Sequence, residues 1–163
     1  MNKTKSEYIT EGLRKSFQDT SCKMANRICY GYTVAKNGEL VINPTEAEIV
    51  RFIFASYNKG DSLGKIAKQL GAKQILSPTG KSKWNREAIS KLLSNEKYVG
   101  NVMLQKTHSF CGIQFENEGE LAKVLMKNHH PAIISLDEFA KTHQLKSERA
   151  KAPKEELIMT ATF

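Results

Sequence analysis

The sequence predicts an α+β fold that is mainly helical and contains a small antiparallel β-sheet. Two observations lead to this class. Apolar residues recur at helical spacing in several stretches, most of them preceded by a capping residue or followed by a glycine. Between these stretches, short runs rich in β-branched and aromatic residues are bounded by turn signals, which is typical of hairpins. With 40% apolar residues among 163, the chain can bury a core of its own.

Residues 4–19 are predicted to form a helix with one narrow apolar stripe. Ile9, Leu13 and Phe17 recur at i, i+4 and i+8. A stripe of this width suits a helix that packs on a missing partner or leads in from another domain, and it equally suits a helix that covers its own core. Residues 20–28 show no periodicity and are expected to be a linker.

A hairpin and a well-capped helix are expected next. Residues 30–42 contain Asn37-Gly38, the preferred pair for a type I′ turn because both central positions need a positive φ. Asn43 is placed to cap the following helix, Pro44 to occupy its first position, and Glu46 to complete a capping box. The face expected to be buried consists of Ala47, Val50, Ile53, Phe54 and Tyr57, and Gly60 is expected just after the helix.

Two further helices are expected between Ser62 and Gly100. Ser62 is placed to cap the first, which Gly71 would end, and Asn85 to cap the second. The loop between them contains Ser77-Pro78-Thr79-Gly80, a turn signature. The residues expected to face the core are Leu63, Ile66, Ala67 and Leu70 in the first helix, and Ile89, Leu92 and Leu93 in the second.

Positive charge is concentrated in this two-helix unit. Nine basic residues and only two acids, Glu87 and Glu96, occur between residues 65 and 106, an excess of seven in a chain of net charge +8. A basic stripe on two helices is typical of nucleic-acid binding, and the second helix would lie in the major groove. Because the loop is about 14 residues long, against three or four in the standard motif, we predict a helix-turn-helix-like unit. The alternative is two ordinary core helices with solvated lysines.

The C-terminal third is expected to alternate short strands and turns before a last helix. Strands are predicted at Val99–Leu104 and Leu121–Met126, with a strand or hairpin around Phe110–Phe115. Ser135 is placed to cap a helix that runs to about Arg149. Other expectations are a turn at His129-His130-Pro131, buried Ile133 and Ile134, and apolar or half-buried Leu136, Phe139, His143 and Leu145.

No catalytic or metal-binding constellation is evident in the sequence. The three cysteines, Cys22, Cys29 and Cys111, include no Cys-x-x-Cys, and the histidines lie at no recognised ligand spacing. There is no glycine-rich phosphate loop and no nucleophile elbow. No run approaches 18 apolar residues and no secretory signal is seen. We therefore expect a cytoplasmic protein with reduced thiols, with no cofactor, no metal and no membrane partner.

Several runs occur together in an order that resembles the recombinase domain of large serine recombinases, which include phage integrases and the recombinases of conjugative transposons. The resemblance extends from about Arg27 to Arg149. Its motifs are YGY at 30–32, GELVINPTEAEIVRFIFASYNKG at 38–60, SLGKIAKQL at 62–70, SPTGKSKWNREAISKLLSNEKYVGNV at 77–102 and KNHHPAIISLDEF at 127–139. Each motif is loose by itself, whereas their order and spacing together are fairly specific.

The resemblance implies a bacterial or phage-encoded fragment of a larger chain. Residues 1–26 would be the connector helix and linker from a missing catalytic domain, 27–150 the recombinase DNA-binding domain, and 151–163 a tail toward a missing zinc-ribbon domain. The fragment would bind double-stranded DNA at one attachment half-site without cutting it. The parent protein would be a dimeric or tetrameric site-specific serine recombinase.

Six residues are the candidates for DNA contact. Lys81, Lys83, Arg86, Ser90 and Lys91 are expected on the surface that faces the duplex. By the resemblance, Arg27 lies where a basic residue would reach the minor groove, although the glycine- and proline-rich linker usual in the family is absent here. Arg86, in the first turn of its helix, is placed to contact a base, whereas Lys68 on the preceding helix could contact only a phosphate.

Two features of this stretch leave the interpretation open. Trp84 could anchor the basic loop, or it could simply pack in the core. Two other functions also remain possible at this point: a helix-turn-helix transcription regulator with an effector-binding tail, and an RNA-binding accessory protein. The RNA-binding class would need exposed aromatic side chains on strands for base stacking, and Tyr30 and Tyr32 are the candidates for that role.

Overall fold

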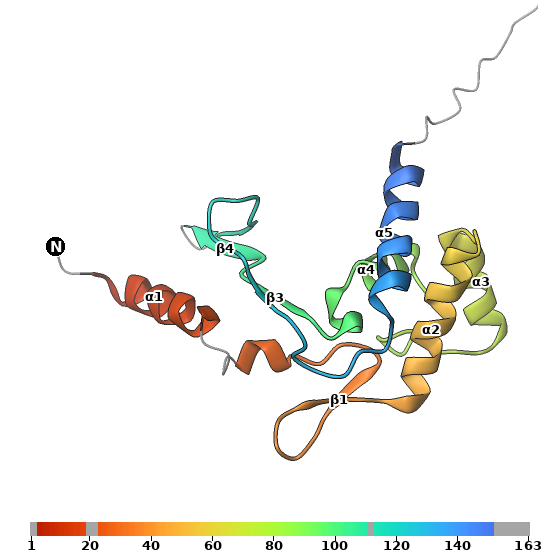
Figure 1. Ribbon diagram of the computed structural model, residues 1–163, viewed down its shortest axis with the longest axis horizontal. Helices are drawn as coiled ribbons and strands as arrows, with labels where there is room; N and C mark the ends of the chain where they lie inside the picture. The colour runs from red at the N-terminus through yellow and green to blue at the C-terminus, as the bar shows by residue number, and fades with distance from the viewer. Residues whose placement is uncertain (1–2, 19–22, 111–112, 152–163) are drawn as a thin grey trace, which may run out of the picture.

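Four of the five described helices form one group. The computed structural model describes residues 3–18, 23–110 and 113–151. Figure 1 shows α2, α3, α4 and α5 gathered together, with α1 lying well away from them. In the described ranges, no helix is both long and apolar enough to cross a membrane. The helices are α1 (Lys5–Gln18), α2 (Pro44–Asn58), α3 (Leu63–Ala72), α4 (Arg86–Leu93) and α5 (Leu136–Lys151), with 3-10 helices at Lys23–Asn26 and Glu96–Val99.

The main hydrophobic core lies among these four helices. The predicted inward face of α2 is buried, and the Phe54 ring lies against the rings of Tyr98 and Phe139. The buried faces predicted for α3 and α4 are confirmed as well, with Leu63 and Ala67 only partly covered. Burial of Ile133 and Ile134 is also confirmed. A mainly helical α+β domain is therefore the observed class, as predicted.

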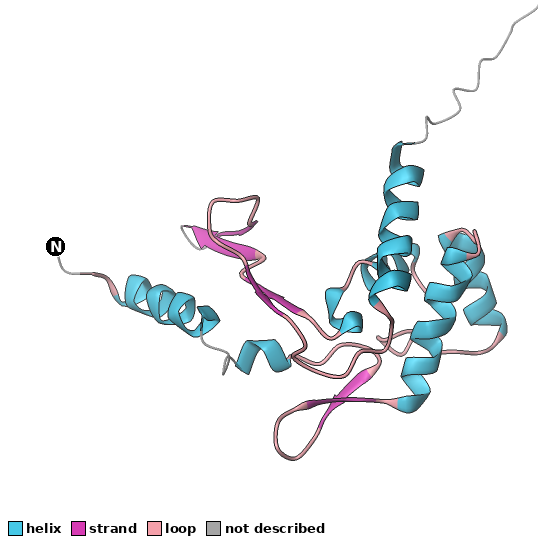
Figure 2. Cartoon of the chain, in the orientation of Figure 1, coloured by secondary structure: helices cyan, strands magenta, loops and turns pink. Residues whose placement is uncertain are grey.

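The strands form three separate two-stranded antiparallel sheets. The predicted hairpins at 30–42 and around 110–115 are confirmed, and Figure 2 shows these strands and their loops between α1 and the helical group. No described strand is longer than four residues, and the strands form separate pairs instead of the single small sheet that was predicted. The pairs are β1 (Tyr32–Val34) with β2 (Leu40–Ile42), β3 (Val102–Leu104) with β6 (Val124–Met126), and β4 (Thr107–Phe110) with β5 (Ile113–Glu116).

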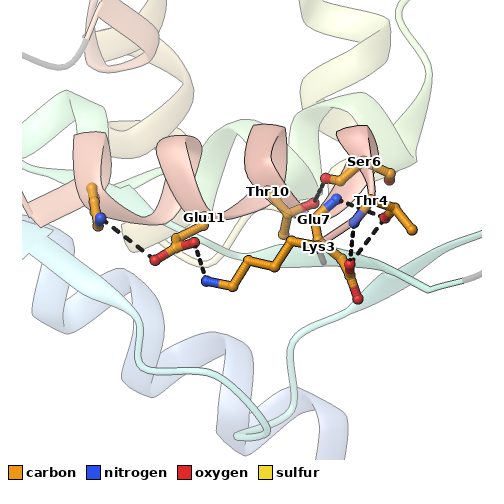
Figure 3. Close-up of polar contacts among 7 residues, drawn as sticks. Lys3, Thr4, Ser6, Glu7, Thr10 and Glu11 are labelled. Atoms are coloured by element: carbon orange, nitrogen blue, oxygen red, sulfur yellow. Dashed lines mark hydrogen bonds and ion pairs between the residues drawn. The ribbon is translucent and has the colours of Figure 1, made fainter. Parts of the chain in front are cut away.

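The helix α1 is held by its own polar contacts more than by the core. Thr4 and Glu7 form a reciprocal cap, in which Thr4 N donates to Glu7 Oε2 at 2.6 Å and Glu7 N donates to Thr4 Oγ1 at 3.3 Å (Figure 3). Glu11 pairs with Lys3 in the same view. Of the predicted stripe, Phe17 packs on a small cluster with buried Ala25, Val102 and Leu104, whereas Ile9 is 56% and Leu13 44% exposed.

Two details of the hairpin and the α2 cap differ from prediction. The turn is closed by Gly38 N donating to Ala35 O at 2.9 Å, and Gly38 carries its one positive φ. Asn37 has no positive φ, and its side chain accepts from Glu39 N, so this is not the predicted type I′ turn. Asn43 caps α2 as predicted, but Glu46 Oε2 accepts from Gly31 N at 2.8 Å, so the capping box is not closed.

The ends of α3 and the face of α5 also differ. Gly71 does not end α3, because Gln74 takes the left-handed conformation and Ile75 N donates to Leu70 O at 3.0 Å, which brings Ile75 against the core. On α5, Leu136 and His143 were expected at apolar or half-buried positions, but Leu136 is 66% exposed and His143 is also exposed. The fully buried residue there is Thr142, whose Oγ1 donates to Asn58 Oδ1 on α2.

Candidate nucleic-acid interface

A groove of about 740 Å³ lies between α3 and the loop that leads into α4. Ser62 and Asn85 cap these two helices, each side chain accepting from a backbone N–H in the first turn, as predicted. The apolar faces of both helices are buried in the common core, so their polar faces are left on the groove. The basic residues on its walls are Lys68, Lys81, Lys83 and Arg86.

The loop between the two helices is fixed at both ends. Ser77 and Gly80 form the predicted turn, with Gly80 N donating to Ser77 O at 2.8 Å. Trp84 is 2% exposed, and its Nε1 donates to Ile75 O at 3.0 Å. Trp84 therefore packs in the core and anchors the loop at once, so both interpretations hold. Lys81 and Lys83, which flank Ser82 just before it, are left exposed.

The four cations of this groove have no protein partner within the described ranges. None of the hydrogen bonds, ion pairs or ring contacts of the described chain involves the charged group of Lys68, Lys81, Lys83 or Arg86. Nearby cations outside this set are engaged: Lys65 pairs with Asp61 at 2.6 Å. An unpaired cluster of four positive charges on one concave surface attracts a polyanion.

Arg86 lies across the backbone of α3. A Cβ placed on Gly64 would be 3.1 Å from Arg86 Nε and 3.2 Å from Nη2. The guanidinium thus covers Gly64 and separates the groove from a second hollow lined by Tyr57, Lys65 and Arg149. Arg149 is held there by its stacking on Tyr57 and its donation to Asp61 O at 3.1 Å. Arg86 is therefore placed by packing and not by a salt bridge.

The other three predicted residues, Arg27, Ser90 and Lys91, line a different hollow of about 890 Å³. Ser90 was expected to face outward, but it is half-buried, because Lys146 Nζ of α5 donates to its O at 2.8 Å and to its Oγ at 3.1 Å. Lys91 pairs with Glu87 at 2.8 Å, and this ion pair lowers the pKa of Glu87. The structure therefore brings together only half of the predicted set.

The backbone at Arg27 is fixed by a lysine that sequence analysis missed. Lys97 Nζ donates to Ala25 O at 3.2 Å and to Arg27 O at 2.5 Å, and burial lowers the pKa of Lys97. The carbonyl of Lys97 in turn accepts from Tyr32 Oη at 3.0 Å and from His130 Nε2 at 2.6 Å. The side chain of Arg27 stays exposed, and no contact of its guanidinium is present within the described ranges.

The adjacent histidines form a structural pair. His130 Nε2 must donate to the Lys97 carbonyl, so its Nδ1 accepts from His129 Nδ1 at 3.0 Å. Burial lowers the pKa of both imidazoles, which favours these neutral forms. Among the described residues, no three His, Cys, Asp or Glu side chains are grouped so that they could hold a metal ion.

Sequence analysis also missed Gly64 and Lys146. Lys146 is 56 residues from the Ser90 that it binds, and Gly64 is 22 residues from Arg86. Neither spacing carries a periodic signal, since the contacts depend on how α3, α4 and α5 pack. The one available hint was that Gly64 interrupts an otherwise good helical sequence.

Comparison with known proteins identifies the family of this chain. A sequence model of the family described as Recombinase matches residues 44–149, well over half of the chain. A structure described as "Crystal Structure of a LSR-DNA Complex" has 21% identity and a TM-score of 0.60, over 91% of this chain and 41% of that one. Another, described as "Sequence Requirements of the Listeria innocua prophage attP site", has 22% identity and a TM-score of 0.61, over 90% and 54%.

These comparisons agree with the resemblance that the sequence motifs predicted. The chain spans about half or less of the length of these two structures, and its likeness to them is one of fold. The family match covers all four helices of the main core and the whole groove. The chain therefore belongs to the Recombinase family.

Proposed function

We propose that this chain binds double-stranded DNA at one half of a recombination attachment site. The observation that carries the proposal is the groove beside α3, where Lys68, Lys81, Lys83 and Arg86 converge without a partner among the described residues. Neutralisation of phosphates by such cations supplies most of the affinity of a DNA-binding protein. Support also comes from the similar fold of a structure described as a complex with DNA.

The groove cations would have different tasks. Lys68, Lys81 and Lys83 are flexible point charges suited to phosphates, which position a protein on the duplex. Arg86, in the first turn of α4, has the fork of donors that a guanine accepts in the major groove. Arg27 would enter the minor groove from a separate surface. Ser90 and Lys91 would first have to exchange their contacts with Lys146 and Glu87, so we place them at the margin of the interface.

The geometry favours duplex DNA over RNA. An RNA-binding surface of the strand type needs aromatic rings that unpaired bases can stack on. Tyr32 is buried, and its Oη donates to two backbone carbonyls, those of Lys97 and Pro131. Tyr30 is half-buried against Trp84. The two tyrosines therefore do not form an exposed pair of rings on a strand. A transcription regulator with an effector site remains the second class, distinguished by an effect of a small ligand on DNA binding.

The role in a larger protein is part of the proposal. Residues 1–26 would connect to a catalytic domain, residues 27–150 would bind the half-site, and residues 151–163 would lead to a zinc ribbon. Of that last range, residues 152–163 lie outside the described part of the chain. The full protein would be a cytoplasmic, bacterial or phage-encoded serine recombinase that acts as a dimer or tetramer. This chain by itself would leave a supercoiled attachment-site plasmid uncut, and it would need no metal.

A salt titration tests the binding proposal. If about five phosphates are neutralised, the logarithm of the binding constant should fall with the logarithm of salt concentration with a slope of about −4 to −5. The measurement is fluorescence anisotropy with a labelled duplex, repeated with the single strand. A slope near zero, or equal affinity for the single strand, would contradict the proposal.

A further inference from the structure

Gly64 and Gly71 both lie within α3, and neither uses the backbone freedom of glycine. Neither glycine has a positive φ. An alanine at either position would therefore be compatible with the backbone, and alanine is the stronger helix former. What remains to distinguish a glycine from an alanine there is the missing Cβ. The two positions differ sharply in what a Cβ would meet.

At Gly64 the atoms nearest to the Cβ would all belong to the guanidinium of Arg86. The three nearest atoms are Arg86 Nε, Nη2 and Cζ, at 3.1, 3.2 and 3.3 Å, all closer than ordinary van der Waals contact. At Gly71 the nearest atom is Ser82 O, at 4.0 Å, where a methyl group fits. Since a guanidinium is the mobile end of a side chain, a methyl group at Gly64 would displace Arg86 and leave the helix in place.

Nothing else in the described ranges holds the guanidinium. Arg86 has no carboxylate or carbonyl partner there, although its five N–H groups could donate to one. The contact with the bare backbone of Gly64 therefore sets the direction of the Arg86 guanidinium. A side chain that is ordered before binding loses less entropy when it contacts its ligand. All five donors remain available for a base or a phosphate.

We propose that Gly64 is a positioning residue for DNA recognition: the absence of a Cβ lets the Arg86 guanidinium lie against α3 and point at one base of the site. This inference rests on the proposed function. It makes Gly64 a determinant of base preference without any contact to DNA. Affinity that comes from phosphates is set by Lys68, Lys81 and Lys83, and it does not depend on Gly64.

The test compares Gly64→Ala with Gly71→Ala, a matched control with the same chemical change in the same helix. The full 163-residue chain would select duplexes from a randomised library, and the preferred duplex and its single-base variants would then be titrated. Arg86→Ala identifies the base position that depends on the arginine, where a bidentate contact gives discrimination of about 5- to 150-fold.

We expect Gly64→Ala to lose most of the discrimination at that same position, while its salt slope is unchanged and its melting temperature is equal or higher. Gly71→Ala should keep the wild-type preference. The double variant Gly64→Ala, Arg86→Ala should match Arg86→Ala alone, because the glycine acts through the arginine.

Each contrary result overturns a distinct statement. Full base preference in Gly64→Ala, full preference in Arg86→Ala, or an equal loss in Gly71→Ala would refute the role of Gly64 and leave DNA binding intact. A wild-type chain that enriches no duplex and shows no salt dependence would refute the proposed function, and the role of Gly64 with it.

Discussion

The two cation-lined hollows next to α4 contain similar numbers of lysines and arginines but differ in how those charges are used. In the groove beside α3, Lys68, Lys81, Lys83 and Arg86 have no partner in the described chain. In the other hollow, four lysines are bound by the protein: Lys91 to Glu87, Lys106 to Glu96, Lys97 to two backbone carbonyls, and Lys146 to Ser90 and Ser94.

This difference shows that a count of basic residues does not locate an interface. A lysine in an ion pair must give up that pair before it can neutralise a phosphate, whereas an unpaired lysine has nothing to exchange. In the second hollow, Lys97 joins the two 3-10 helices, Lys106 binds Glu96, and Lys146 joins α5 to α4, whereas Lys91 pairs within α4. Arg27, which also lines this hollow, has no contact of its guanidinium within the described ranges. The four charges of the groove have no partner to exchange in the described part of the chain. Substitutions in the core, in the second hollow and in the groove test this contrast, in order of decreasing expected effect.

Phe54→Ala should cause the largest loss, because both surfaces depend on one core. Phe54 is fully buried against Tyr98 and Phe139, so its removal leaves a cavity that costs about 3–5 kcal/mol of unfolding free energy. Urea denaturation followed by circular dichroism measures this quantity. A loss below about 1 kcal/mol would show that the two surfaces do not share this core.

Lys97→Met should lower stability without changing the number of phosphates bound. The methionine keeps the aliphatic stem but cannot donate to Ala25 O and Arg27 O, so we expect a loss of about 1–3 kcal/mol and faster amide exchange at residues 23–27. Lys68→Met is the control from the groove and should change stability by less than about 0.5 kcal/mol. Equal stability effects in the two variants would remove the distinction between bound and free lysines.

Arg86→Ala and Lys68→Ala should separate base contact from phosphate contact within the groove. Loss of Arg86 should flatten the preference at one base position by about 1–3 kcal/mol, whereas loss of Lys68 should weaken all duplexes about equally. Titration of both variants with a selected site and its single-base variants measures this. If Arg86→Ala retains every preference, α4 does not contact the bases and the loop 77–84 becomes the candidate.

Much of the fold could be predicted because its signals are local. The caps by Asn43, Ser62, Asn85 and Ser135 need only a short polar side chain before an apolar periodic stretch, and all four are present. Two predictions were wrong because a residue makes a tertiary contact instead of the expected local one. Glu46 binds Gly31 instead of its own cap, and α3 extends past Gly71 because Ile75 packs in the core.

The site was predicted only in part, for the same physical reason. Their positions in the sequence predicted that Lys81, Lys83 and Arg86 belong to the same two-helix unit, and in the structure all three line one groove. Whether a cation is free depends on carboxylates and carbonyls contributed by other elements, as with Lys146 of α5 at Ser90. No single-sequence pattern reports such contacts, which is why Ser90 and Lys91 were grouped with Arg86.

The most direct test of the free-cation account is the salt dependence of two variants that each remove two positive charges. Lys81→Gln with Lys83→Gln changes the groove, and Lys91→Gln with Lys106→Gln changes the paired lysines of the other hollow. With a selected duplex, we predict that the groove variant lowers the magnitude of the log–log salt slope by about 2, while the paired-lysine variant leaves it unchanged. Equal changes in both variants, or a change confined to the paired-lysine variant, would contradict the account.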